Sequence, residues 1–119
     1  MRIIGRSPLL TAYSVSQAGT VYSNTMDFSR CTGEVAVLIT STAGKITVTQ
    51  QCSIDNKNWF DPYNSSGASV GMVCLNLTVT TGKYIAYTPV LSQYMRFKVV
   101  ENNTAATVVN LTLLFQEQS

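Results

Sequence analysis

Apolar and polar residues alternate along most of this chain, and this period of two is the feature that most limits its fold. Successive side chains of a β-strand point to opposite faces of a sheet, so alternation predicts strands that are buried on one face. Two segments carry the pattern best: residues 53–60, which run through a polar turn to the only tryptophan, and residues 94–99. No eleven-residue window has the 3.6-residue period of an amphipathic helix. The pattern therefore predicts an all-β chain, with these two segments as two edges of one β-sandwich.

Turn residues separate the other β-forming runs at regular intervals, which predicts a single sandwich or jelly roll of about eight antiparallel strands. The expected strands cover residues 9–15, 20–28, 34–40, 45–54, 72–80, 83–88, 92–101 and 106–116. Short turn segments, 41–44 and 102–105, follow the third and seventh strands, so each is expected to close a hairpin. In the fifth strand, the residues expected to face the core are Val73, Leu75, Leu77 and Val79.

The first eight residues are expected to form an N-terminal arm, followed by one sandwich domain over residues 9–119. The first ten residues combine two arginines with four large aliphatic side chains, which is too apolar for a free tail. We expect this segment to order against a neighbouring protein, through Arg2, Ile3, Ile4, Arg6, Leu9 and Leu10. The alternative is that Ile3 and Ile4 simply belong to an edge strand.

Arg6 and Pro8 interrupt the apolar run at the N-terminus, so a signal-peptide core is not expected. No segment approaches the roughly 20 apolar residues of a membrane span. Charged residues make up only 12% of the chain, its net charge is +2, and its basic residues are scattered. Binding to nucleic acid needs clustered basic residues, so neither nucleic acid nor membrane is an expected partner. Weak charge leaves little repulsion between copies, which suits a protein that is packed against partners.

The residues that carry common enzyme chemistry are missing or scattered. The chain has no histidine for a hydrolytic triad and no glycine-rich phosphate loop. Asp55 and Asp61 flank a turn and are expected to cap it, and Lys57 would place a cation inside a calcium cage formed there. We therefore expect no enzymatic activity, no metal and no cofactor.

The three cysteines, Cys31, Cys52 and Cys74, leave at least one thiol unpaired. We expect free, buried thiols that pack as small hydrophobes. The alternative is a disulfide, either within the chain or between copies that meet an oxidising medium.

Trp59, Phe60 and Tyr63 form the densest aromatic cluster of the sequence. A tryptophan just after a turn is expected to plug the open end of the sandwich. The alternative is that the three rings are exposed and stack on sugars, with Asp55 or Asp61 binding the hydroxyl groups.

A strand that ends in Ser-x-Asp-x-x-x-Trp is followed by a long loop, a strand Tyr-Met-Arg-Phe-Lys-Val, an Asn/Thr turn and a last apolar strand. Over residues 34–116 this order resembles the small β-sandwich modules of tailed-bacteriophage virion proteins. Such modules serve as capsid decoration (cement) proteins, head fibres and tail-tip or baseplate pieces. The resemblance implies architecture only: Arg96 running along a sheet face, with Trp59 and Tyr94 in the core.

These observations lead to the expectation of a non-enzymatic virion component, made in the host cytoplasm. It would be a capsid decoration protein that binds the major capsid protein or other virion proteins and stabilises the shell by bridging capsomers. A closed homo-oligomer is expected, preferably a trimer. The alternatives are a tail, head-fibre or baseplate adaptor, and a carbohydrate-binding module that uses Trp59, Phe60 and Tyr63.

Overall fold

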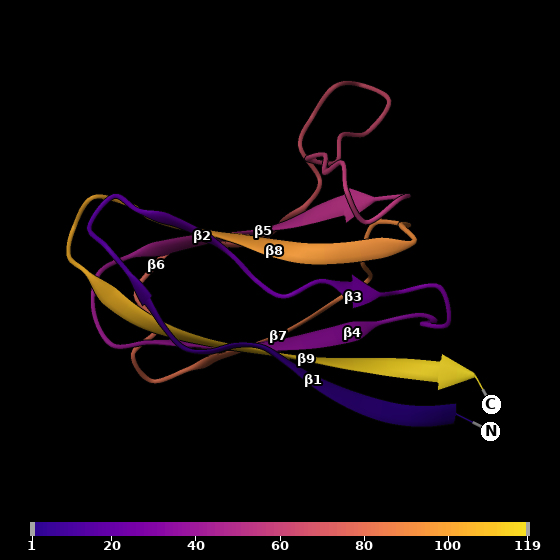
Figure 1. Ribbon diagram of the computed structural model, residues 1–119, viewed down its shortest axis with the longest axis horizontal. Helices are drawn as coiled ribbons and strands as arrows, with labels where there is room; N and C mark the ends of the chain where they lie inside the picture. Colours follow the sequence, from indigo (N-terminus) through magenta and orange to yellow (C-terminus); the bar gives the residue numbers. More distant parts are fainter. Residues whose placement is uncertain (1, 119) are drawn as a thin grey trace.

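The computed structural model describes the backbone of residues 2–118 and the side chains of residues 4–117. Within these residues the chain forms two antiparallel sheets packed face to face, with no helix (Figure 1). The strands are β1 (Arg2–Val15), β2 (Thr20–Tyr22), β3 (Met26–Asp27), β4 (Val35–Ser41), β5 (Ile46–Ser53), β6 (Met72–Leu77), β7 (Lys83–Tyr87), β8 (Tyr94–Glu101) and β9 (Thr107–Gln118). The predicted all-β sandwich is confirmed.

The first sheet has the strand order β1-β9-β4-β7, and the second has the order β2-β8-β5-β6, with β3 also paired to β8. The two predicted hairpins are therefore wrong, because β4 and β5 lie in different sheets, as do β8 and β9. Packed sheets are only about 10 Å apart, so a short link can cross between them as easily as it can close a hairpin. Link length alone did not distinguish the two arrangements.

The side chain of Glu101 holds these crossing links in place at one end of the sandwich. This buried carboxylate accepts hydrogen bonds from the N–H of Ala18 (3.0 Å), the N–H of Lys45 (3.2 Å) and the hydroxyl of Thr104 (2.6 Å). Each donor belongs to a different link between strands: β1 to β2, β4 to β5 and β8 to β9. One carboxylate thus satisfies the backbone of three turns.

Of the two segments with the clearest alternation, residues 94–99 lie in β8, in the middle of the second sheet and not at an edge, whereas residues 54–59 form the turn and loop after β5. β5 pairs along its length with β8, from Ile46 opposite Glu101 to Ser53 opposite Tyr94. β6 covers the other side of β5, and β2 and β3 cover the other side of β8. Alternation reports which face of a strand is buried and not which strands lie beside it.

The core lies between the two sheets and is built from the inward residues of the four central strands. Its fully buried side chains include Val37 and Ile39 from β4, Leu111 and Leu113 from β9, Ile46 and Val48 from β5, and Phe97 and Val99 from β8. Burying each of the larger side chains contributes roughly 1.5–3 kcal/mol.

Residues 2–8, predicted as an arm, form the first half of the edge strand β1. Its backbone pairs with β9 from Arg2 opposite Gln118 to Val15 opposite Thr107, with two irregularities along the way. This is the edge-strand alternative; Met1, the first residue of the predicted arm, lies outside the described residues. The expected strand 20–28 is divided into β2 and β3. At Ser23 the backbone N–H still donates to the carbonyl of Phe97, but the N–H of Phe97 donates to the side-chain Oγ of Ser23 and not to its backbone carbonyl.

The predicted core face of the strand at residues 72–80 is wrong. Cys74 is buried, whereas Leu75 is 58% exposed and Leu77 is 37% exposed. The pairing of β6 with β5 shifts register twice, and Asn76 has a positive φ of 47°. Each such irregularity reverses which side chains face inward. Val73 is half-buried, and Val79, beyond the strand, is buried as expected.

Candidate functional site

The outer face of the first sheet is mainly apolar. In its paired rows Leu38 lies opposite Tyr84, and Ala36 lies between Ala86 and Leu114. Tyr84 is 64% exposed, and it lines a shallow hollow of 220 Å³ together with Ile4 and Leu114. We call these six residues the apolar face: Ile4, Ala36, Leu38, Tyr84, Ala86 and Leu114.

Charge is sparse on this face, although Glu34, immediately before β4, lines the hollow. Among the outward positions of β1, β9, β4 and β7 that the structure describes, Arg6 is the only charged residue, and it lies opposite Leu114. Isolated exposed apolar residues are ordinary, but a contiguous patch on one sheet is typical of an interaction surface. The apolar face is therefore a candidate docking surface.

The residues of the predicted partner-binding arm do not act as one group. Ile4 and Arg6 are exposed on the outer side of β1, whereas Leu9 and Leu10 are buried in the core and are not available to a partner. Arg2 and Ile3 pair through their backbones with Gln118 and Glu117, and their side chains lie outside the described residues. Burial of two consecutive leucines follows from the irregular pairing of β1 next to Pro8.

The outer face of the second sheet is polar and is organised around Arg96. The guanidinium of Arg96 lies between two aromatic rings, 4.2 Å from the centroid of Tyr22 and 4.5 Å from that of Trp59. Its Nε donates a 2.9 Å hydrogen bond to Gln51, and the Gln51 amide donates a 3.0 Å bond to the carboxylate of Asp61. The predicted course of Arg96 along the sheet face is confirmed.

The position of Trp59 corrects two predictions. Its ring is half-buried on the outer face, against Arg96, so it neither plugs the end of the sandwich nor belongs to the core. A planar guanidinium at an outward position of a strand offers a tryptophan a favourable cation–π partner outside the core. Tyr94, also expected in the core, is a half-buried residue at an outward position opposite Ser53.

Asp55 caps the turn before Trp59, as predicted. Its carboxylate accepts hydrogen bonds from the backbone N–H of Asn58 and of Lys57 and from the side-chain amide of Asn58. These hydrogen bonds hold the pKa of Asp55 well below its usual range. Because the turn itself uses this carboxylate, Asp55 is a poor candidate for binding an external ligand.

A polar groove of 280 Å³ runs over β5 and β8 and beside the loop that connects β5 to β6. In Figure 1 this loop rises away from the second sheet, on the side opposite the first sheet. The groove is lined by side chains from both strands, from the loop and from the turn after β8, including Thr47, Thr49, Asp61, Tyr63, Lys98 and Asn102.

Of the three aromatic residues predicted as an alternative glycan site, only Tyr63 lines this groove. Tyr63 and Phe60 are each 63% exposed, but Phe60 is not part of the groove, and Trp59 is engaged by Arg96. Sequence reasoning missed Lys98 and Asn102, which lie far from the loop in the chain. In the sequence, the polar residues that alternate along β5 and β8 indicate a face in contact with water, but they do not indicate a binding site on it.

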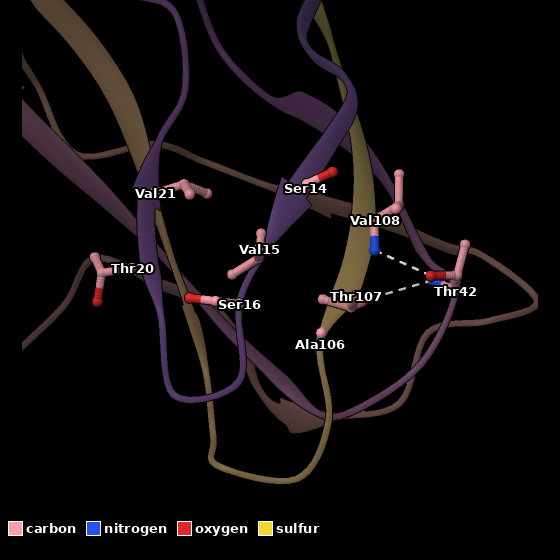
Figure 2. Close-up of a pocket in the computed structure, with 9 residues that line it drawn as sticks. All are labelled: Ser14, Val15, Ser16, Thr20, Val21, Thr42, Ala106, Thr107 and Val108. Carbon is pink, nitrogen blue, oxygen red and sulfur yellow. Dashed lines mark hydrogen bonds between the residues drawn. The ribbon is translucent and has the colours of Figure 1, made fainter.

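A second pocket, of 510 Å³, opens where β1, β2 and the start of β9 meet (Figure 2). Hydroxyl groups and short aliphatic side chains line it, and none of its lining residues is charged. Three hydrogen bonds join Thr42 to the start of β9. Its N–H donates to the hydroxyl of Thr107 and to the carbonyl of Val108, and its hydroxyl accepts from the N–H of Val108. The threonines therefore stabilise the link after β4, and the lining residues of this pocket include no histidine, carboxylate or amine that could activate a hydroxyl as a nucleophile.

A third pocket, of 590 Å³ and mostly apolar, lies beside the segment that precedes β8 and is lined by Phe28, Cys31, Ile54 and Leu91 among others.

The three cysteines are free thiols, as predicted. Cys74 is buried, and Cys31 and Cys52 are half-buried. Burial, together with the nearby carboxylates of Glu117 and Asp27, raises the pKa of the Cys31 thiol to about 11. A thiol of this kind is a weak nucleophile at neutral pH.

Within the described part of the chain, no three His, Cys, Asp or Glu side chains come together in a way that could hold a metal ion. Residues 2–118 also contain no helix long and apolar enough to span a membrane. No protein-family model and no curated protein matches the sequence.

Proposed function

We propose that this chain is a non-enzymatic structural component of a bacteriophage virion, and that it docks on the outer capsid surface as a decoration protein. The observation that carries the proposal is the apolar face, where the exposed side chains of Leu38 and Tyr84 lie side by side on adjacent strands and Ile4 is exposed on β1. The sequence resemblance to virion β-sandwich modules supports the choice of a capsid as the partner.

The size of the apolar face supports binding by several copies at once. Strands lie about 4.8 Å apart and outward residues about 7 Å apart along a strand, so the face covers roughly 15 Å by 15 Å. A standard stable interface takes roughly 800 Å² from each partner, several times this area. One copy would therefore bind weakly, and a homotrimer at a threefold position of the shell would gain affinity by engaging three faces together.

In this arrangement the second sheet points away from the shell. Its outer face carries Arg96, Lys98 and the β5–β6 loop, and it remains in contact with solvent. Docking stabilises the shell by removing apolar surface from water, at roughly 25 cal/mol per Å², and by joining neighbouring capsomers. No covalent step is involved.

Co-sedimentation with empty capsid shells tests this proposal, using shells of the phage that encodes the chain. We expect saturable binding by the wild-type chain, and binding weakened by about tenfold or more in Leu38→Asp and Tyr84→Asp. Phe60→Asp is the matched control, because Phe60 is equally exposed but belongs to the loop over the second sheet. Absence of wild-type binding, or equal binding by all four proteins, would overturn the proposal. Binding to tails alone would favour the adaptor alternative.

A further inference from the structure

We propose that the groove over the outer face of the second sheet binds a neutral saccharide, with Tyr63 as the stacking surface and Asp61 and Lys98 as the groups that bind sugar hydroxyls. The inference does not rest on capsid docking, because the groove and the apolar face belong to opposite faces of the sandwich.

Tyr63 presents an aromatic ring on a well-fixed segment of the loop. Its backbone pairs with Ser69, and the N–H of Val70 donates to the carbonyl of Pro62. At the tip, the side-chain oxygen of Asn64 accepts hydrogen bonds from three donors in residues 66–68. The backbone that carries the ring is thus held in place, and the ring is 63% exposed. A tyrosine has only two side-chain torsions to fix, so its ring loses little conformational entropy when the C–H face of a sugar stacks on it.

A chain of hydrogen bonds that begins at Arg96 and passes through Gln51 orients the side chain of Asp61. Arg96 is fixed between two rings, it bonds Gln51, and Gln51 donates to Oδ1 of Asp61. Within residues 4–117, Oδ2 of Asp61 has no hydrogen-bond partner, so it is available to accept bonds from an external ligand. These hydrogen bonds position the carboxylate of Asp61 at the groove and occupy only one of its two oxygens.

Lys98 supplies the complementary donor from β8. It lies opposite Thr49 in the sheet and lines the same groove as Asp61. On the neighbouring wall, the amide of Asn102 donates a 2.9 Å hydrogen bond to the hydroxyl of Thr47. A carboxylate accepts several hydrogen bonds through its two oxygens and an ammonium donates up to three, so a sugar hydroxyl finds both an acceptor and a donor in this groove.

The charge and size of the groove restrict the ligand. One carboxylate and one ammonium cancel, which favours a neutral sugar over a uronic acid or a phosphate. The volume of 280 Å³ lies at the lower end of ligand sites, so a short stretch of saccharide fits and a larger cofactor does not.

The test is nitrogen-15 NMR titration of the full chain with maltohexaose, cellohexaose, mannohexaose and chitohexaose, with trigalacturonate as the acidic probe. We expect at least one neutral hexasaccharide to shift the amide signals of Tyr63, Lys98 and Asn102 saturably. Tyr63→Ala and Asp61→Asn should each weaken that binding by about tenfold or more. Phe60→Ala, which removes an equally exposed ring outside the groove, should bind as the wild type does.

Three outcomes would overturn the inference. They are the absence of groove shifts with all four neutral probes, a loss in Phe60→Ala as large as that in Tyr63→Ala, and binding of trigalacturonate in place of the neutral probes. Thermal unfolding of each variant shows whether a loss of binding reflects a loss of fold. Because the groove lies away from Leu38, Leu38→Asp should bind the saccharide normally even if it fails to bind capsid shells.

Discussion

The hydroxyl of Tyr87 in β7 donates a 3.0 Å hydrogen bond to the side-chain oxygen of Gln50 in β5, across the interior of the sandwich. Gln50 is fully buried, and its amide donates to the carbonyl of Val90 at 3.2 Å. Burial raises the pKa of the Tyr87 hydroxyl above its ordinary value, so it remains a donor over the physiological range. A satisfied polar pair inside an apolar core joins the two sheets at one defined position.

Removing the Tyr87 hydroxyl should therefore destabilise the fold. Tyr87→Phe leaves the Gln50 oxygen buried without this donor, and we expect the free energy of unfolding to fall by about 1–3 kcal/mol. The double variant Gln50→Leu/Tyr87→Phe should lose less than the sum of the two single changes, because no unpaired partner remains. Urea unfolding measures all three. Unchanged stability in Tyr87→Phe would show that this hydrogen bond is not formed in solution.

Glu101 should make the fold sensitive to acid. Burial acts to raise the pKa of this carboxyl, but hydrogen bonds from Thr104, Ala18 and Lys45 outweigh burial and lower the pKa to about 2. The charged form is thus favoured in the folded state. Its contribution to stability is present above the ordinary value of 4.5 and is lost as the pH falls from about 4.5 towards 2.

The measurement is the free energy of unfolding as a function of pH, for the wild type and Glu101→Gln. The glutamine variant should be less stable at neutral pH, and its stability should depend less on pH between about 4.5 and 2. Asp55, whose pKa is also lowered, contributes a dependence of the same sign, and Asp55→Asn measures its share. Identical acid profiles for wild type and Glu101→Gln would contradict this account of the three links.

Stacking of Arg96 between Tyr22 and Trp59 predicts that lysine cannot replace it. Lysine keeps the charge but lacks the flat guanidinium and the Nε donor to Gln51, so Arg96→Lys should cost nearly as much as Arg96→Ala, about 1–2 kcal/mol. Trp59→Ala should also fold, with a loss of similar size, because this ring lies outside the core. Chemical denaturation followed by circular dichroism measures these losses. A Trp59→Ala chain that fails to fold would support the sequence-based expectation of a core tryptophan.

The cysteines should react slowly with thiol reagents in the folded protein. Cys74 is buried, and the pKa of Cys31 is raised to about 11, so little thiolate forms at pH 8. With an aromatic disulfide reagent, we expect Cys31 to react more slowly than free cysteine does, and all three thiols to react quickly in denaturant. The Cys31→Ser variant identifies the contribution of this thiol. Rapid modification of Cys31 in the native state would show that its surroundings are more open than the structure indicates.

Alternation predicted β5 and β8 well, because their inward residues belong to the core and their outward residues are mostly polar. β4 and β9 also place apolar residues outward, among them Leu38 and Leu114. Alternation failed where the backbone departs from a regular strand. The irregular pairing around β6, with Asn76 at positive φ, reversed the expected core face, and short links that cross between sheets looked like hairpins. Nothing in a linear pattern distinguishes a link that stays in one sheet from one that changes sheet.

The candidate surfaces were harder to predict than the strands. Tyr63 was recognised from its neighbours in the chain, but its partner Lys98 lies in β8 and reaches the groove only because β5 and β8 are adjacent. The apolar face was missed for a similar reason. Leu38, Tyr84 and Leu114 come from three strands, and each one looks like an ordinary exception to alternation until the sheet places them side by side.

Hydroxyl-radical footprinting of the chain bound to capsid shells shows which sheet faces the shell, because tyrosines mark both outer faces. If the chain docks through the apolar face, Tyr84 becomes protected on binding, while Tyr63, over the second sheet, remains as reactive as in the free chain. Protection of Tyr63 with continued reactivity of Tyr84 would show that the chain docks through the second sheet and not through the apolar face.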